Sequence, residues 1–154
     1  MPKKTWNEKL RVGNGLPKVE PISDKMSKRL GFGTMVVPSP LEVDEIMRTV
    51  GEGKLITADI IRTKLAEKHG ATTTCPLTTG IFTKIAAFAA EENIKEGGKD
   101  ITPYWRTLKT GGELNEKYPG GIDNHKILLE VEGHMVKQKG KRYYVENYES
   151  CIAQ

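Results

Sequence analysis

The stretch that most constrains how this chain folds is Ile101-Thr102-Pro103-Tyr104-Trp105-Arg106. A proline fixes its own φ angle and biases the preceding residue toward an extended backbone. Two bulky aromatic residues follow it directly, and glycine-containing loops lie on both sides, at 97–98 and 111–112. We therefore expect residues 103–106 to form a rigid, presented segment that neighbouring helices hold in place, and not the middle of a helix.

Length and composition indicate a single globular domain. The chain has 154 residues, of which 37% are hydrophobic and 29% are charged, as is usual for soluble proteins. No apolar run approaches the roughly 20 residues of a membrane-spanning helix, and the lysine-rich N-terminus lacks the apolar region of a secretory signal. We expect a cytoplasmic monomer with no membrane partner, associated with the nucleoid if it binds DNA.

The cysteines and histidines do not have the spacing of a metal site. Cys75 and Cys151 are far apart and form no CxxC pair, and His69, His125 and His134 supply none of the usual ligand pairings. The sequence therefore predicts reduced cysteines, no metal site and no cofactor.

The net charge of +4 is concentrated near the N-terminus. Residues 1–36 contain eight Lys and Arg against three Asp and Glu, whereas the rest of the chain contains 16 against 17. Such a basic arm can follow nucleic-acid phosphates, or it can be a solvated and partly disordered tail. We expect residues 1–37 to be an irregular extension with a short strand at 34–37, anchored by Trp6, and residues 38–154 to form the domain.

Three helices are predicted in the first half of the domain. Ser39, Pro40 and Glu42 form a helix start with a capping box, and apolar residues at 43, 46, 47 and 50 then share one face. A second helix runs from about 58 to 69, with Thr57 as its cap and Gly70 as its stop. A third runs from residue 76 to about 93, with Ile81 among the residues of its apolar face.

The second and third of these helices, joined by a threonine-rich turn at 71–74, fit a helix-turn-helix arrangement. A fourth helix at about 122–132 and a hairpin at 135–145 follow, with a turn at Lys139-Gly140. The predicted fold class is mixed α/β and mainly α, a winged-helix domain with a small C-terminal β-hairpin. Its candidate helix-turn-helix residues are Thr57, Thr78, Thr79 and Lys84.

The segment from 103 to 133 resembles the methylated-DNA–protein cysteine methyltransferases, the alkylguanine repair proteins. That family has a Pro-Cys-His-Arg motif followed by Gly, then Tyr-x-Gly-Gly, then Lys-x-x-Leu-Leu-x-x-Glu-Gly. The matching residues here are Pro103-Tyr104-Trp105-Arg106, Gly111, Tyr118-Pro119-Gly120-Gly121, Leu128-Leu129 and Glu132-Gly133, with His125 at the lysine position. The resemblance weakens over residues 39–95 and does not cover residues 1–37.

The departures from the family pattern decide the expected activity. Tyr104 replaces the alkyl-accepting cysteine, and Trp105 replaces the histidine that activates it. A phenol with a pKa near 10 is a poor substitute for a thiolate, and an indole cannot usefully accept a proton. Transfer of an alkyl group by the family's mechanism is therefore not expected. The chain most resembles the non-catalytic alkyltransferase-like branch of the family, in which tryptophan typically replaces the cysteine. Members of that branch bind lesions without catalysis and recruit other repair factors, but they retain the histidine that Trp105 replaces here.

Two further positions depart from the pattern. The arginine that family members insert into the base stack corresponds to Gly80, and the tyrosine early in the helix-turn-helix corresponds to Ala58. A base-flipping protein must fill the stack that it opens, and glycine has no side chain with which to do so.

Each candidate site residue has a functional and a structural interpretation. Tyr104 and Trp105 can stack on an extruded base or fill the former pocket, and Arg106 can bind a phosphate or brace its loop. Tyr118, with Gly120 and Gly121, can line a lesion pocket or form an ordinary turn. Glu132 matches the family's glutamate that orients the histidine and belongs to the candidate lesion pocket, or it can be a solvated helix-end residue.

Three functions follow from these interpretations. The first is non-catalytic binding of double-stranded DNA, alkylated or distorted, with a repair protein as a further partner. The second is a protein-interaction or structural module with a filled pocket. The third is an enzyme that uses Cys75 near a helix N-terminus.

Overall fold

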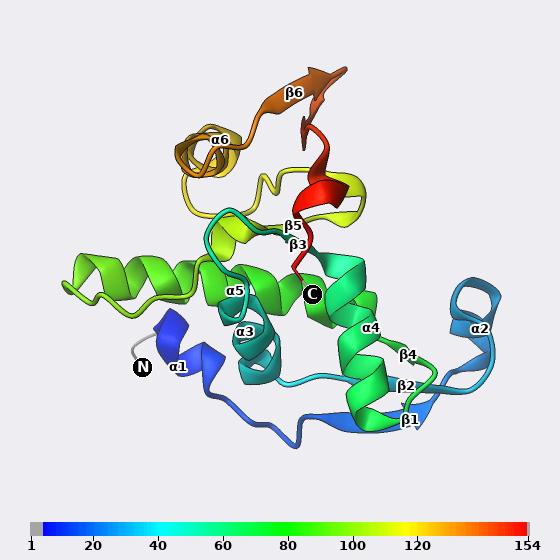
Figure 1. Cartoon of the computed structure of the whole chain (residues 1–154). Coiled ribbons are helices and arrows are strands. Elements are labelled where there is room, and N and C mark those ends of the chain that lie inside the picture. The colour runs from blue at the N-terminus through cyan, green and yellow to red at the C-terminus, as the bar shows by residue number, and fades with distance from the viewer. Residues whose placement is uncertain (1–4, 154) are drawn as a thin grey trace.

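The computed structural model describes residues 5–153 and shows a mixed α/β fold that is mainly helical (Figure 1). The helices are α1 (Trp6–Leu10), α2 (Asp24–Leu30), α3 (Pro40–Arg48), α4 (Ala58–His69), α5 (Pro76–Lys95) and α6 (Gly121–Val131). The strands are β1 (Lys18–Pro21), β2 (Thr34–Val37), β3 (Ile56–Thr57), β4 (Thr73–Thr74), β5 (Thr107–Leu108), β6 (Val136–Lys139) and β7 (Arg142–Val145). Short 3-10 helices cover Tyr104–Arg106, Thr110–Gly112 and Tyr148–Cys151.

The long helix α5 is the centre of the main core. Its buried face carries alanines at 86, 87, 89 and 90, whose small side chains let α1 and α3 approach closely. Val43 and Met47 of α3 and Ile61 and Leu65 of α4 join the same cluster and are fully buried. The core is thus built by helices around α5.

A second, smaller core lies under α6 and the C-terminal hairpin, in the upper part of Figure 1. Leu108, Leu114, Leu129 and Val145 are all buried in it. Leu55 joins this core and bridges to Ile152, so residues after α3 and residues near the C-terminus close it together.

The signals that start and stop the predicted helices operate as expected. The Ser39 hydroxyl accepts a hydrogen bond from the Glu42 amide, and the Glu42 carboxylate accepts one from the Ser39 amide, which completes the capping box. Gly70 ends α4 in the left-handed region at φ 63°. β6 and β7 form the predicted antiparallel hairpin.

Regular elements occupy the segment that the sequence indicated to be irregular. Within residues 5–37, α1, β1, α2 and β2 are all formed, and β1 pairs antiparallel with β2, which pairs parallel with β4. The strand at 34–37 was predicted, whereas α1, β1 and α2 were not. The boundary between an extension and a domain at 37/38 stays a prediction.

The anchoring role predicted for Trp6 is confirmed. Its ring stacks on Phe88 of α5 with the centroids 4.7 Å apart. The amides of Trp6 and Asn7 donate to the Glu92 carboxylate at 2.8 and 3.0 Å. These contacts join parts of the chain about 85 residues apart, which local sequence patterns do not reveal.

No helix within residues 5–153 combines the length and apolarity that a bilayer crossing requires.

Candidate nucleic-acid interface

Tyr104 lies inside the protein, whereas the sequence indicated a presented segment. It begins a 3-10 helix directly after Pro103 and is only 1% exposed, because Trp105 and Tyr118 pack against it. Both ring pairs have centroids 5.4 Å apart and are nearly perpendicular. Burial, followed by the charge of Glu91, raises the pKa of Tyr104 to about 12, so the phenol stays protonated at neutral pH.

Glu132 binds both residues that follow Tyr104. Its carboxylate accepts hydrogen bonds from Trp105 Nε1 at 3.0 Å and from Arg106 Nη2 at 2.7 Å. Burial alone would raise the pKa of this carboxyl, but hydrogen bonds from Arg106, Trp105 and the Gly53 amide outweigh it and hold the pKa below its usual value. Glu132 is therefore a buried anion with several donors and not a solvated residue at the helix end.

Arg106 braces the segment, which was one of its two predicted roles. Besides the pairing with Glu132, its Nη1 donates to the Val50 carbonyl at 2.8 Å. The Gly53 amide donates to Glu132 Oε1 at 3.2 Å. The loop after α3, the 3-10 helix and the end of α6 are thus joined through one ion pair.

His125 holds the backbone of Trp105 from the other side. The Asn115 amide donates to its Nδ1 at 3.1 Å, so Nε2 carries the proton and donates to the Trp105 carbonyl at 2.9 Å. Burial lowers the pKa of His125 to about 4, although the hydrogen bond to Trp105 opposes this shift. His125 is consequently a neutral structural side chain.

The glycine turn before α6 completes this cluster. Gly120 has φ 79°, and a Cβ there would lie 2.5 Å from Asn124 Cβ. Asn124 Nδ2 donates to the Pro119 carbonyl at 2.9 Å and to the Tyr104 hydroxyl at 3.3 Å. The turn thus needs a small residue at 120 so that Asn124 can reach Tyr104.

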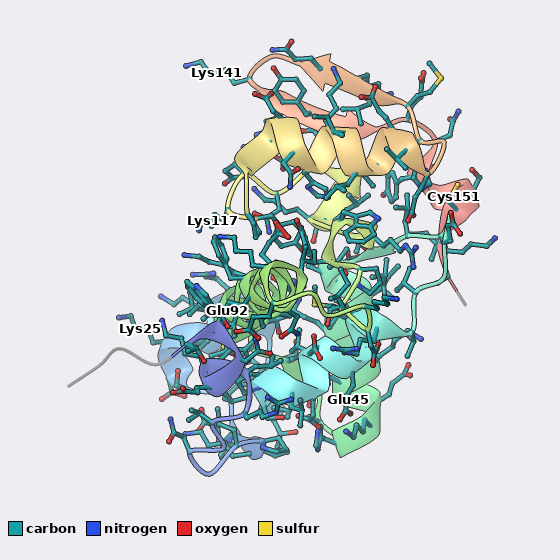
Figure 2. All side chains as sticks on the ribbon, turned by 90° about the vertical axis from the view of Figure 1, so that its left-hand side faces the viewer. Lys25, Glu45, Glu92, Lys117, Lys141 and Cys151 are labelled. Carbon is teal, nitrogen blue, oxygen red and sulfur yellow. The ribbon has the colours of Figure 1, made fainter. Side chains whose placement is uncertain are left out.

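A groove of about 630 Å³ runs between α5 and the loop that carries Tyr118. Leu77, Gly80 and Ile81 of α5 line one wall, and Tyr118 lines the other. Four lysines and one carboxylate also line it: Lys9, Lys84, Lys109, Lys117 and Glu116. Figure 2, which looks along α5, places Lys117 and Cys151 on opposite sides of the molecule. The groove is therefore an apolar channel with a basic border on one side of the fold.

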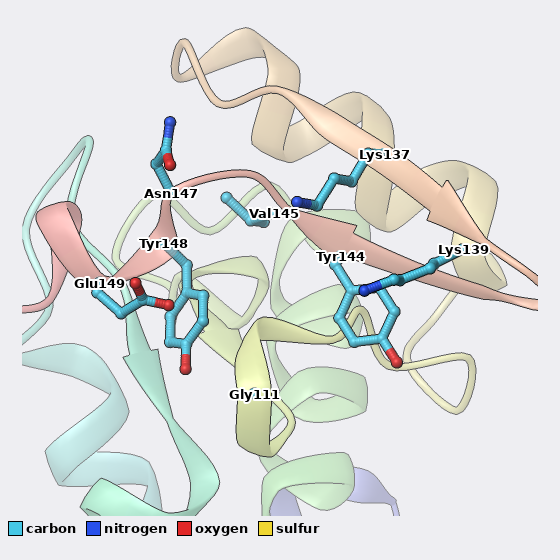
Figure 3. A pocket seen from close by; sticks show the side chains of 8 residues that line it. All are labelled: Gly111, Lys137, Lys139, Tyr144, Val145, Asn147, Tyr148 and Glu149. Carbon is cyan, nitrogen blue, oxygen red and sulfur yellow. The ribbon is translucent and has the colours of Figure 1, made fainter.

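A second hollow, of about 380 Å³, lies beside the C-terminal hairpin (Figure 3). Lys137 and Lys139 of β6, Tyr144 of β7 and Tyr148 point around it. It contains none of the candidate site residues from the sequence.

Comparison with known proteins finds similar structures but no matching family model or curated sequence. Two solved structures resemble this chain: Schizosaccharomyces pombe Atl1 in complex with damaged DNA containing O6-carboxymethylguanine, and S. pombe ATL in complex with DNA. The TM-scores are 0.53 and 0.54, with 18% identity over 75% of this chain and 94% of the other in both cases. The chain has an alkyltransferase-like fold.

This fold brings together the site residues predicted from residues 103–133. The ring of Tyr104 contacts that of Trp105, and Glu132 accepts hydrogen bonds from both Trp105 and Arg106. Tyr118 is 3% exposed and donates its hydroxyl hydrogen to the Thr107 carbonyl at 3.0 Å, which supports the loop. Burial raises the pKa of Tyr118 above its ordinary value.

The candidate helix-turn-helix residues are divided between the core and the groove. Thr57 and Thr79 are buried, and the Thr79 hydroxyl donates to the Cys75 carbonyl at 2.8 Å. Lys84 lines the groove, whereas Thr78 is half-buried outside its lining. The two buried threonines therefore support the helices and do not form their surface.

Several groove residues were missed or misplaced by the sequence analysis. Ile81 was expected on the buried face of its helix, but it is 46% exposed, because Phe82 and Thr83 occupy the inward positions. The spacing of Leu77, Ile81 and Lys84 at i, i+4 and i+7 indicates that they share one helix face, and this was the sequence pattern from which the groove wall could be predicted. Lys109 and Lys117 come from a loop that no pattern places beside α5.

Cys75 does not face this groove. It is 8% exposed and packs with Ile22, Met35 and Val37 beside the three-stranded sheet. This position favours the structural interpretation of the thiol over the hypothesis of an enzyme that uses it.

Proposed function

We propose that this protein binds double-stranded DNA without catalysis and senses alkylated or distorted bases. In this proposal α4 and α5 act as a helix-turn-helix, the β6–β7 hairpin acts as a wing, and the protein is a cytoplasmic monomer that recruits a repair partner. The observation that carries the proposal is the lysine-bordered groove along α5. Lysines positioned along one groove can neutralise DNA phosphates and release their counterions.

Two further observations support the proposal. The S. pombe proteins with the same fold were solved on DNA, in one case on damaged DNA. Tyr104, at the position of the family's acceptor cysteine, is buried and protonated, so it offers no nucleophile at neutral pH.

The test is binding of the full chain to a fluorescent duplex, with and without one O6-alkylated guanine, across a salt series. Tighter binding to the alkylated duplex would support damage sensing. Equal and salt-sensitive binding to both duplexes would keep DNA binding and reject lesion sensing. No binding to either duplex at low salt would reject the proposal.

A protein-interaction module is the second candidate, because two observations favour it. Tyr104, which corresponds to the family's acceptor cysteine, is buried, and Ile127, Val131 and Met135 are 57%, 78% and 69% exposed at a spacing of four residues on and after α6. The duplex experiment separates the two functions, since absence of DNA binding would leave this module as the better candidate.

A further inference from the structure

We propose that Leu77 and Ile81 form an apolar wedge that α5 inserts between stacked base pairs of duplex DNA. This inference rests on the proposed function and names the side chains that open the stack.

The first argument is exposure. Leu77 is 72% exposed and Ile81 is 46% exposed, and residues four apart on a helix lie on the same face. Gly80 lies beside them, and a Cβ there would have no heavy atom within 4 Å. The two side chains therefore project above a notch in the helix surface. Large apolar side chains that enter a base step are a known means of kinking a duplex.

The second argument is rigidity. The opposite face of α5 is fixed in the core by Phe82, Ala86 and Ala90, which are all buried. The helix has 20 residues and packs against both α1 and α3. A wedge must resist the stacking of the bases that it separates, and a helix anchored along its length can do this.

The third argument is charge complementarity around the wedge. Four lysines and one glutamate share the groove, and Lys84 follows Ile81 on the same helix face. A duplex presents apolar base faces beside rows of phosphates, which matches exposed apolar side chains with lysines in the same groove, although Lys109 is paired with Glu116 at 3.3 Å. An anionic bilayer also combines apolar and negatively charged groups, but its surface is broad and flat. Leu77 and Ile81 lie in a groove whose other wall is the loop around Tyr118, and a broad flat surface does not fit a groove.

The experiment measures bending and affinity together. A short duplex with donor and acceptor dyes at its ends reports the kink of about 20–90° that wedge insertion produces. We expect the wild-type chain to raise energy transfer on binding. The double variant Leu77→Ser, Ile81→Ser should lose most of this rise and bind about tenfold more weakly, since it buries less apolar surface.

The matched control is Phe32→Ser with Ile94→Ser, which removes two exposed apolar side chains elsewhere, one of them at the other end of α5. It should bend and bind DNA as the wild type does. Both variants change exposed residues, and circular dichroism checks that they fold.

Three results would overturn the wedge. Wild-type binding without a rise in energy transfer would do so, and so would an unchanged rise with the double variant; either result leaves the proposed function intact. Binding to vesicles of anionic lipid but not to the duplex would reject the wedge and the proposed function together.

Discussion

At the scale of single residues, the ion pair between Arg106 and Glu132 is the contact on which the segment from 104 to 106 most depends. Both side chains are mostly buried, at 14% and 6% exposure. Glu132→Ala leaves the guanidinium without its carboxylate, and removing one partner of a buried pair costs about 3 kcal/mol. We expect this loss in the free energy of unfolding measured with urea. Glu130→Ala, which changes an exposed residue in the last turn of α6, should change this free energy little; equal losses would contradict this account.

His125 predicts a pH dependence of stability. Its pKa is about 4 in the folded protein and 6.5 ordinarily, so below pH 6.5 the unfolded chain binds a proton that the folded chain excludes. The contribution of neutral His125 to stability is fully present above its ordinary pKa of 6.5. It is lost as the pH falls toward its pKa of about 4 in the folded protein. Between about pH 7 and pH 5 the free energy of unfolding should fall by about 2 kcal/mol.

Urea titrations at several pH values measure this loss, and His125→Gln should remove most of it while lowering stability overall. The buried His134, whose pKa burial also lowers, is the comparison. If His134→Gln removes the pH dependence and His125→Gln does not, the assignment to His125 is wrong.

At the scale of elements, α5 contains an interior glycine that nothing in the fold requires. Gly80 has no neighbour within 4 Å of an added Cβ, and glycine inside a helix costs about 0.5–1 kcal/mol relative to alanine. Gly80→Ala should therefore raise the free energy of unfolding by that amount in urea or thermal unfolding. Gly70→Ala is the contrast, because Gly70 has φ 63° at the end of α4 and the change should destabilise the protein. A destabilising Gly80→Ala would refute this interpretation of α5.

The docking of α1 depends on one carboxylate of α5. Glu92 accepts the amides of Trp6 and Asn7, and these bonds together with the charge of Lys9 keep its pKa low against the opposing effect of burial. Glu92→Gln should weaken both bonds and speed hydrogen exchange at these two amides, as measured by NMR. Glu96→Gln, at the exposed end of the same helix, should leave both rates unchanged. Unchanged exchange with Glu92→Gln would show that the stacking of Trp6 on Phe88 suffices.

At the scale of the whole molecule, the local signals that begin and end the elements after Ser39 were interpreted correctly, whereas those before residue 34 were missed and distant contacts were not predicted. The helices from Ser39 to Lys95 and the final hairpin follow from caps, stops and periodicity within a few residues. The burial of Tyr104 depends on Tyr118, and the pairing of Arg106 with Glu132 spans 26 residues. A motif can place such residues in order, but only the fold decides which of them face solvent.

The distribution of charge over the molecule gives the last prediction. The basic excess of the sequence lies in residues 1–36, yet of the described residues in that segment, 5–36, only Lys9 lines the groove. Its other three lysines come from α5 and the loop around Tyr118. If the groove binds phosphates, Lys84→Gln and Lys117→Gln should each weaken duplex binding at low salt. Each should also reduce the slope of log K against log salt by about 0.9.

Lys54→Gln is the matched control for these two variants. Leu55, the next residue, donates its amide to the Cys151 carbonyl, and Figure 2 shows Cys151 on the side of the molecule opposite Lys117. The control should keep the wild-type slope, because an exposed lysine there cannot reach a duplex bound in the groove. If all three variants reduce the slope equally, the chain binds DNA through its overall charge, and the groove is not the interface.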